Sequence, residues 1–243
     1  MTDTVTKHCS LCNDTGWKIV VKDGREFAQK CDCQARDNYL TKGKNINIPK
    51  RFLTVNLDNY YPDKKYPSQT KAKEIVQKFI SDYPSGSKGI LLQGSVGVGK
   101  TKLLCIIGLE LMKKFGNKVD IYYVDWGELV REMRYGDHIA NRDFSYINKL
   151  IFKLAEVDIL LFDELGSATA TTWVLDNIYY IFNKRYNEQK TTLCATNYWD
   201  ESINEQEETL EKRVGKLIRS RLYEMTQIVR IRGEDLRKHS KKD

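Results

Sequence analysis

The chain has 243 residues, of which 41% are hydrophobic, and a formal net charge of +7 at pH 7. It has no apolar run of membrane-spanning length and no hydrophobic signal-peptide segment at its N-terminus, so we expect a soluble cytoplasmic protein with no membrane partner. The length suffices for one sizeable core with a small appendage, and the positive charge, although spread thinly, suits a polyanionic partner.

Four of the six cysteines lie near the N-terminus, as Cys9-x-x-Cys12 and Cys31-x-Cys33. In a reducing compartment, two close pairs are typical of a zinc site rather than of disulfides. Two β-prone stretches between the pairs flank an Asp-Gly turn at residues 23–24, which predicts a hairpin that brings the pairs together. All four cysteines are therefore predicted ligands of Zn²⁺. Redox-active or incidental cysteines are the alternative.

The next stretch, residues 34–68, is polar and contains three of the four prolines. It is predicted to be a linker that packs partly on the following domain, with an anchored entry near residues 48–52. After it, apolar residues at helical spacing predict a helix over residues 69–83. The chain is therefore divided into a hairpin domain (1–33), a linker (34–68) and a larger domain (69–243).

A phosphate-loop motif, G-x-x-x-x-G-K-[ST], follows an apolar stretch at 89–93 and opens a helical stretch at 102–114. Its residues are Gly94, Ser95, Val96, Gly97, Val98, Gly99, Lys100 and Thr101. The backbone N–H groups of such a loop and the helix N-terminus are expected to hold the phosphates of ATP. Lys100 should reach the β- and γ-phosphates, and the Thr101 hydroxyl should ligate Mg²⁺. A glycine-rich turn that binds no ligand is the alternative.

Polar residues end two further apolar runs. The run at 158–162 is followed by Asp163, a candidate for holding Mg²⁺, and by Glu164, a candidate for activating the attacking water. The run at 191–196 ends at Asn197, which could hold that water or touch the γ-phosphate. A solvated strand end for the two acids and an ordinary turn residue for Asn197 are the alternatives.

Strands are expected at 89–93, 119–124, 157–163 and 191–196, with helical stretches between them. A helix at about 207–224 and a last strand at 227–231 follow. This alternation predicts an α/β fold with a parallel, doubly wound sheet.

The segment 126–154 is long for a single crossover between two strands, and its pattern predicts two helices. The first carries Arg131 and Arg134, and Tyr135 stands where it breaks. Basic and aromatic groups bind single strands through phosphate contacts and base stacking, so these three residues could line a nucleic-acid channel. A solvated helix face is the alternative.

Taken together, the cysteine pairs, the phosphate loop, the run Arg213–Met225 and the segment Gly233–Arg237 resemble the DnaC/DnaI-type bacterial and phage helicase loaders. These are relatives of the IstB transposition ATPases. The stretch Ser-Arg-Leu-x-Glu-Met at 220–225 is the most specific part of the resemblance. The resemblance implies a P-loop AAA+ ATPase with a parallel sheet flanked by helices, next to the small N-terminal zinc-binding hairpin domain.

The resemblance also implies roles for individual segments. Arg221 would be an arginine finger that acts on the ATP of a neighbouring subunit in an ATP-dependent oligomer, and Asn197 would be the sensor of the γ-phosphate. The helix pair 126–154 would face single-stranded DNA, and the zinc domain would dock on the replicative DNA helicase. The chain departs from the family at Leu217, where relatives usually carry Arg; Arg219 or Arg237 could supply the second basic group.

The resemblance therefore implies an ATP-dependent helicase loader of DNA replication that hydrolyses ATP. The alternative is an IstB-like transposition ATPase that binds duplex DNA and a transposase, and a third possibility is a nucleotide-gated scaffold with negligible turnover. The cysteine pairs favour the loader, and Glu164 favours an enzyme over a scaffold because a scaffold needs no water-activating carboxylate.

Overall fold

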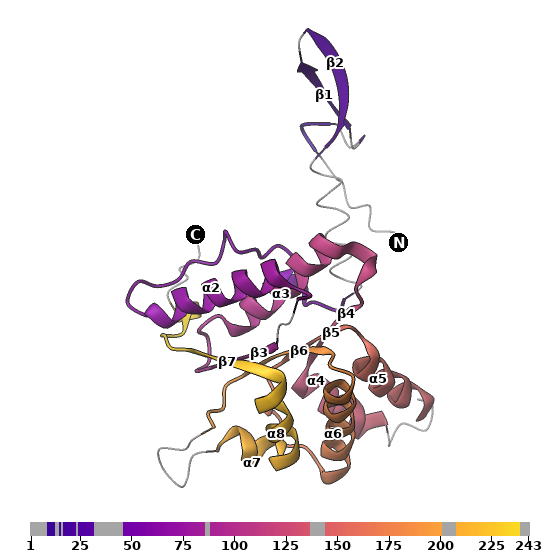
Figure 1. Ribbon diagram of the computed structural model, residues 1–243, viewed down its shortest axis with the longest axis vertical. Helices are drawn as coiled ribbons and strands as arrows, with labels where there is room; N and C mark the ends of the chain where they lie inside the picture. Colours follow the sequence, from indigo (N-terminus) through magenta and orange to yellow (C-terminus); the bar gives the residue numbers. More distant parts are fainter. Residues whose placement is uncertain are drawn as a thin grey trace.

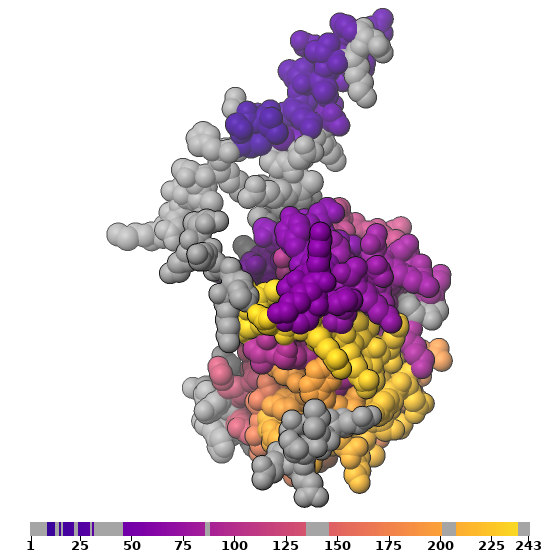
Figure 2. All heavy atoms as spheres, turned by 90° about the vertical axis from the view of Figure 1, so that its left-hand side faces the viewer, coloured from indigo at the N-terminus to yellow at the C-terminus, as the bar shows by residue number. Residues whose placement is uncertain are grey.

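The computed structural model describes residues 9–12, 15, 17–22, 24–31, 46–85, 88–136, 144–200 and 208–238. Near the N-terminus, β1 (Trp17–Lys22) and β2 (Arg25–Lys30) pair antiparallel around Gly24, whose φ of 70° suits the turn. Figure 1 and Figure 2 show this hairpin standing away from the sheet and its helices.

A five-stranded parallel sheet forms the centre of the larger unit, with the strand order β4-β5-β6-β3-β7. The parallel sheet flanked by helices confirms the predicted fold class. Every residue of β3 and β5 is buried, as expected for strands covered on both faces. The strands are β3 (Gly89–Gly94), β4 (Ile121–Asp125), β5 (Ile159–Asp163), β6 (Thr191–Thr196) and β7 (Thr226–Ile231).

Helices cover both faces of the sheet (Figure 1). One face carries α2 (Pro67–Asp82) and α3 (Lys100–Phe115). The other carries α4 (Trp126–Gly136), α5 (Phe144–Glu156), α6 (Thr172–Asn187), α7 (Leu210–Val214) and α8 (Lys216–Met225). Short 3-10 turns lie at η1 (Lys50–Phe52), η2 (Gly116–Lys118) and η3 (Leu236–Lys238). In the part of the chain described, no helix has the length and apolar character needed to cross a bilayer.

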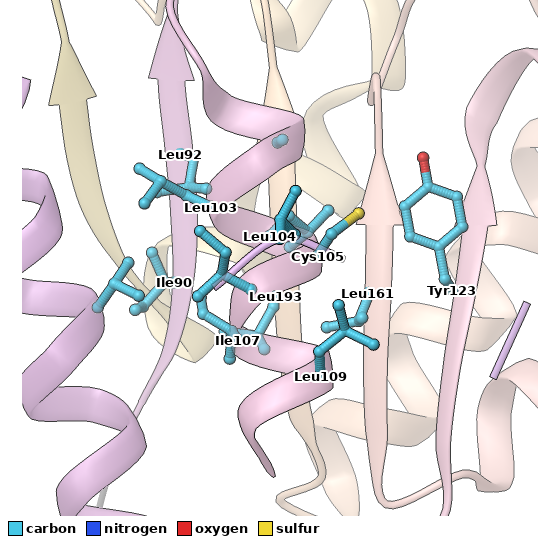
Figure 3. Close-up of a cluster of buried hydrophobic side chains, with 14 of the residues drawn as sticks. Ile90, Leu92, Leu103, Leu104, Cys105, Ile107, Leu109, Tyr123, Leu161 and Leu193 are labelled. Carbon is cyan, nitrogen blue, oxygen red and sulfur yellow. The ribbon is translucent and has the colours of Figure 1, made fainter. Parts of the chain in front are cut away.

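The core is divided by the sheet, because alternate residues of each strand point to opposite faces. Ile90 and Leu92 of β3 pack with α3, whereas Leu91 packs with α4 to α8. Figure 3 shows the first cluster, in which the side chains of α3 lie against those of the strands. The phosphate-loop motif is therefore joined on both sides to rigid, buried elements.

Part of the stretch assigned to the linker contributes to this core. Ile46, Ile48, Leu53, Val55 and Tyr60 are buried in the cluster that contains α2 and α3. The backbone N–H of Tyr123 in β4 also donates to the Ile46 carbonyl at 2.8 Å. Residues 46–66 therefore pack on the face of the sheet that carries α2 and α3.

The helix expected at about 207–224 is wrong as a single element, because α7 and α8 are separate helices. Gly215 separates them with a φ of 86°, a conformation that a helix interior does not contain and that glycine adopts readily. The side chain of Thr209 caps α7 by accepting from the Lys212 N–H. The break gives α8 its own direction against α6 and β7.

Candidate nucleotide site

The phosphate-loop motif turns directly from β3 into α3. Gly97 and Gly99 have φ values of 82° and 97°, a region that residues with a Cβ rarely adopt. A Cβ at Gly97 would lie 2.0 Å from a carboxylate oxygen of Asp235, so only glycine fits there. The loop therefore presents backbone rather than side chains at the N-terminus of α3, which is the arrangement that binds phosphate oxygens.

Lys100 is the buried cation of this loop, with 7% of its surface exposed. Its ammonium donates to the carbonyls of Gly94 (2.8 Å) and Ser95 (2.7 Å) and to Asn197 Oδ1 (2.7 Å). Burial lowers the pKa of Lys100 to about 8, and attraction to Asp163 and Glu164 opposes that shift. The lysine is thus held at the mouth of the loop by neutral oxygens, where an anionic phosphate group would be a stronger partner.

Asp163 ends β5 with 2% of its surface exposed. Its carboxylate accepts from the Tyr123 hydroxyl at 2.8 Å and from the Glu164 N–H at 2.9 Å, and it is hydrogen-bonded to Thr101. Burial raises its pKa, and these hydrogen bonds oppose the rise. The two residues predicted to hold Mg²⁺, Thr101 and Asp163, are therefore in contact, and their hydroxyl and carboxylate oxygens are the hard donors that Mg²⁺ prefers.

Glu164 lies at the turn that follows β5 and has a φ of 49°. A left-handed conformation at a non-glycine residue is strained and is frequent at functional sites. The residue is exposed overall, but partial burial of its carboxyl group, together with the charges of Asp163 and Asp125, raises the pKa of that group. A raised pKa makes a carboxylate a better proton acceptor, so Glu164 suits the activation of water.

Asn197 follows β6. The two residues before it, Ala195 and Thr196, are hydrogen-bonded to Leu165, which follows Glu164. The Thr196 hydroxyl donates to the Leu165 carbonyl at 2.8 Å, and the Leu165 N–H donates to the Ala195 carbonyl at 2.8 Å. The fold thus brings Lys100, Asp163, Glu164 and Asn197 together at the carboxyl ends of three adjacent strands, β3, β6 and β5.

Three contributors to the site were missed by sequence reasoning. The Tyr123 hydroxyl donates a hydrogen bond to Asp163. Asp125 lies opposite Asp163 in the parallel pairing of β4 with β5. The third, Tyr60, lies 3.1 Å from the position of a Cβ on Gly99. Asp125 was detectable, because it follows a predicted strand just as Asp163 does; the positions of Tyr60 and Tyr123 depend on contacts distant in sequence.

The segment after β7 lies against the phosphate loop. The Leu236 N–H donates to the Gly97 carbonyl at 3.1 Å, and Asp235 binds the Arg237 guanidinium at 2.9 and 3.0 Å. The charge of Arg237 helps to lower the pKa of Lys100, whereas Arg219 is 2% exposed and paired with Asp200. Of the two candidates for a second basic group, Arg237 is thus the one near the loop.

Among the described residues, Arg221 lies against α6 and not against the phosphate loop. Its Nε donates to Asn183 Oδ1 at 3.2 Å, and its guanidinium lies 4.5 Å from the centre of the Tyr186 ring. The side chain is half-buried on the flank of α6 and α8. Part of its surface is therefore exposed at this flank.

The predicted DNA-binding residues lie on α4. Arg131 and Arg134 are both exposed, but the Arg134 guanidinium donates to the Thr169 carbonyl and so has a structural partner. Tyr135 belongs to α4, and its side chain lies outside the described residues. Arg131 is therefore the better probe of nucleic-acid binding.

Three of the four predicted zinc ligands lie together. The Sγ atoms of Cys9, Cys12 and Cys31 are within 4.8 Å of one another, and those of Cys9 and Cys31 are 3.7 Å apart. Two thiolates on a tetrahedral zinc, each at about 2.3 Å, stand about 3.8 Å apart, whereas a disulfide requires about 2.05 Å. The cluster therefore fits a tetrahedral metal site; Cys33 lies outside the described residues.

The sequence of this chain is similar to those of known proteins. The family model for IstB-like ATP binding proteins matches residues 55–243. The replicative helicase loader DnaI of Bacillus subtilis is 26% identical over 96% of this chain and 79% of that protein. The phage-like element PBSX protein XkdC of the same bacterium is 25% identical over 89% and 79%.

Solved structures agree with the sequence matches. A DnaC helicase loader structure matches 75% of this chain and 99% of its own with a TM-score of 0.61 at 29% identity. A DnaI structure matches 75% and 94% with a TM-score of 0.60 at 26% identity. Structures of the replication initiator DnaA match at 22% identity, which supports the fold alone.

Proposed function

The chain belongs to the IstB-like ATP binding protein family, and we propose that it is an ATP-dependent loader of a replicative DNA helicase. The observation that supports an active ATPase most strongly is the contact of Lys100 with Asn197 beside the Thr101–Asp163 pair. A protein that only bound nucleotide would not need a strained, exposed carboxylate at Glu164 next to this group.

Each of these side chains has one step in the proposed hydrolysis. The loop amides and Lys100 would bind the phosphates, and Thr101 and Asp163 would hold Mg²⁺, which would neutralise phosphate charge. Glu164 accepts a proton from the attacking water, and Asn197 orients the water or the γ-phosphate after Lys100 exchanges the Asn197 oxygen for phosphate. The Tyr123 hydroxyl donates to the Asp163 carboxylate and so opposes the rise in its pKa that burial causes.

In this proposal Arg221 acts on the ATP of the next subunit. Its contacts with Asn183 and Tyr186 direct it along the flank of α6, and a guanidinium supplied from outside can stabilise charge that develops on the transferred phosphoryl group. ATP binding would then join protomers into an oligomer, and hydrolysis would release the helicase.

The hairpin and α4–α5 would supply the other partners. A zinc-stapled hairpin that stands apart from the ATPase sheet suits docking on the helicase, and Arg131 on α4 suits contact with single-stranded DNA. Both assignments also rest on the similarity to DnaI and DnaC, which are described as helicase loaders.

The test is a loading assay with a bacterial replicative helicase. We expect this protein to place the helicase on circular single-stranded DNA when ATP is present, and Lys100→Ala to abolish loading. An IstB-like transposition ATPase is the competing function, since the matching family model is that of IstB-like ATP binding proteins. Capture of a transposase, together with binding of duplex DNA and no helicase loading, would favour it instead.

A further inference from the structure

Asp200 connects three elements that are distant in sequence. Its carboxylate is bonded to the Arg219 guanidinium of α8 and accepts from Gln93 Nε2 of β3 at 3.3 Å. Gln93 Nε2 also donates to the Tyr198 carbonyl at 2.8 Å. The segment that leaves β6 is thus tied to β3 on one side and to α8 on the other.

These side chains are buried. Gln93 is fully buried, and the side chains of Arg219 and Asp200 are 3% and 5% exposed. The Arg219 guanidinium also stacks on the Tyr223 ring at 3.3 Å, which fixes its plane. Among the described residues, neither Nη atom of Arg219 has a hydrogen-bond acceptor, so the pair carries a desolvation penalty that an apolar contact would avoid. Stability alone does not account for such a pair.

Both ends of this network adjoin the nucleotide site. Gln93 immediately precedes Gly94, the first residue of the phosphate loop, and Asp200 lies three residues after Asn197, the acceptor of the Lys100 ammonium. When Lys100 exchanges Asn197 for a phosphate, the segment 197–200 loses one of its attachments. Any shift of that segment reaches Arg219 through the Asp200 carboxylate.

The other end of the network sets the direction of Arg221. Arg219 and Arg221 are two residues apart on α8, so their side chains point about 200° apart around the helix axis. Fixing Arg219 in the core therefore fixes Arg221 on the opposite side, against Asn183. The break at Gly215 leaves α8 as a short, separate helix, and its rotation is fixed by the Arg219 ion pair together with the buried Ile218 and Leu222.

We propose that Asp200 and Arg219 are positioning residues that hold the arginine-finger helix in register with the nucleotide site. The pair couples occupation of the phosphate loop in one protomer to presentation of Arg221 to the next. This inference rests on the proposed action of Arg221 between subunits, and it assigns a function to a pair that the hydrolysis steps themselves do not use.

The test is an asymmetric mixing experiment on the full chain. Lys100→Ala has an intact finger but a defective site, whereas Arg221→Ala has an intact site but no finger. Asp200→Asn is mixed with each, and ATP hydrolysis is measured. We expect Asp200→Asn with Lys100→Ala to recover activity at least tenfold over either protein alone, because the partner supplies the finger. Asp200→Asn with Arg221→Ala should stay inactive, because neither protein presents a finger correctly.

Controls separate this inference from a folding defect and from the proposed function. Glu208→Gln removes a neighbouring ion pair with Arg213 and should behave as wild type. If Asp200→Asn does not fold, Asp200→Leu with Arg219→Met removes both charges together and should show the same asymmetry. Recovery in both mixtures, or in neither despite folded and co-assembled protein, overturns the inference. If Lys100→Ala and Arg221→Ala fail to complement each other, the finger proposal itself fails, and this inference fails with it.

Discussion

The ammonium of Lys100 donates to the side-chain oxygen of Asn197 across 2.7 Å, although the residues are 97 positions apart. This bond connects the first turn of α3 with the end of β6, and it occupies both groups that a γ-phosphate would need. Binding of ATP therefore requires an exchange of partners at Lys100, and the exchange has measurable consequences for protons and for turnover.

Proton uptake should accompany ATP binding above pH 8. Burial lowers the pKa of Lys100 to about 8 in the protein alone, whereas phosphates favour the charged ammonium and raise that pKa. The protein alone loses this proton as the pH rises past 8, so ATP binding must restore it and should weaken with rising pH. At pH 8.5, where phosphates are fully ionised, we expect uptake of about half to one proton per ATP.

Calorimetry in buffers of different ionisation enthalpy measures this uptake. Lys100→Arg is the matched control, because a guanidinium stays charged throughout this range and should show no uptake. Equal uptake by the wild type and by Lys100→Arg would show that another group titrates.

One zinc ion per chain is expected in freshly reduced protein, bound by Cys9, Cys12, Cys31 and Cys33. Cys31→Ser should lose the metal, because three ligands of a small hairpin hold zinc far more weakly than four. Cys194→Ala is the control, since it removes a thiol that is buried in the sheet. Metal analysis after gel filtration decides the matter: zinc retained by Cys31→Ser, or absent from the wild type, would refute the site.

Single-stranded DNA should bind along α4 and α5 when ATP is present. Arg131→Glu should weaken binding at least fivefold and reduce the salt slope by about 1–2, because it removes a phosphate contact and adds repulsion. Lys78→Glu makes the same charge change at an exposed position on α2, on the other face of the sheet, and should have little effect. Fluorescence anisotropy at several salt concentrations compares them. If both variants lost the same DNA affinity, the loss would reflect the net charge of the protein rather than a contact on α4. If Arg131→Glu lost no affinity, α4 would be an ordinary solvent-exposed helix.

The sequence predicts those parts of the fold that depend on local patterns. Apolar runs bounded by turns predict all five strands of the sheet to within about two residues, and the phosphate-loop motif predicts the join of β3 to α3. The helix break at Gly215 was missed because the apolar spacing continues across it. The C-terminal helix could have been divided there, since an isolated glycine in a helical pattern is a warning.

Contacts between distant segments are what the sequence could not predict. Tyr123 meets Asp163 only through the register of β4 with β5, and Asp200 meets Arg219 only after α8 packs against the sheet. Likewise, Arg134 reads as a free basic residue until its bond to the Thr169 carbonyl is seen. Each depends on tertiary geometry that residue spacing does not encode.

Turnover at Glu164 is the property on which the proposed loading cycle depends most. Glu164→Gln keeps the size of the side chain and removes the proton acceptor, so ATP affinity should remain within about twofold of wild type while turnover falls at least about 100-fold. The decisive measurement is phosphate release by wild type and Glu164→Gln at saturating ATP, with helicase and single-stranded DNA present and nucleotide affinity determined in parallel. Intact affinity with abolished release is the predicted result. Release at the wild-type rate by Glu164→Gln would contradict the assignment of Glu164 as the base and, with it, the hydrolysis mechanism.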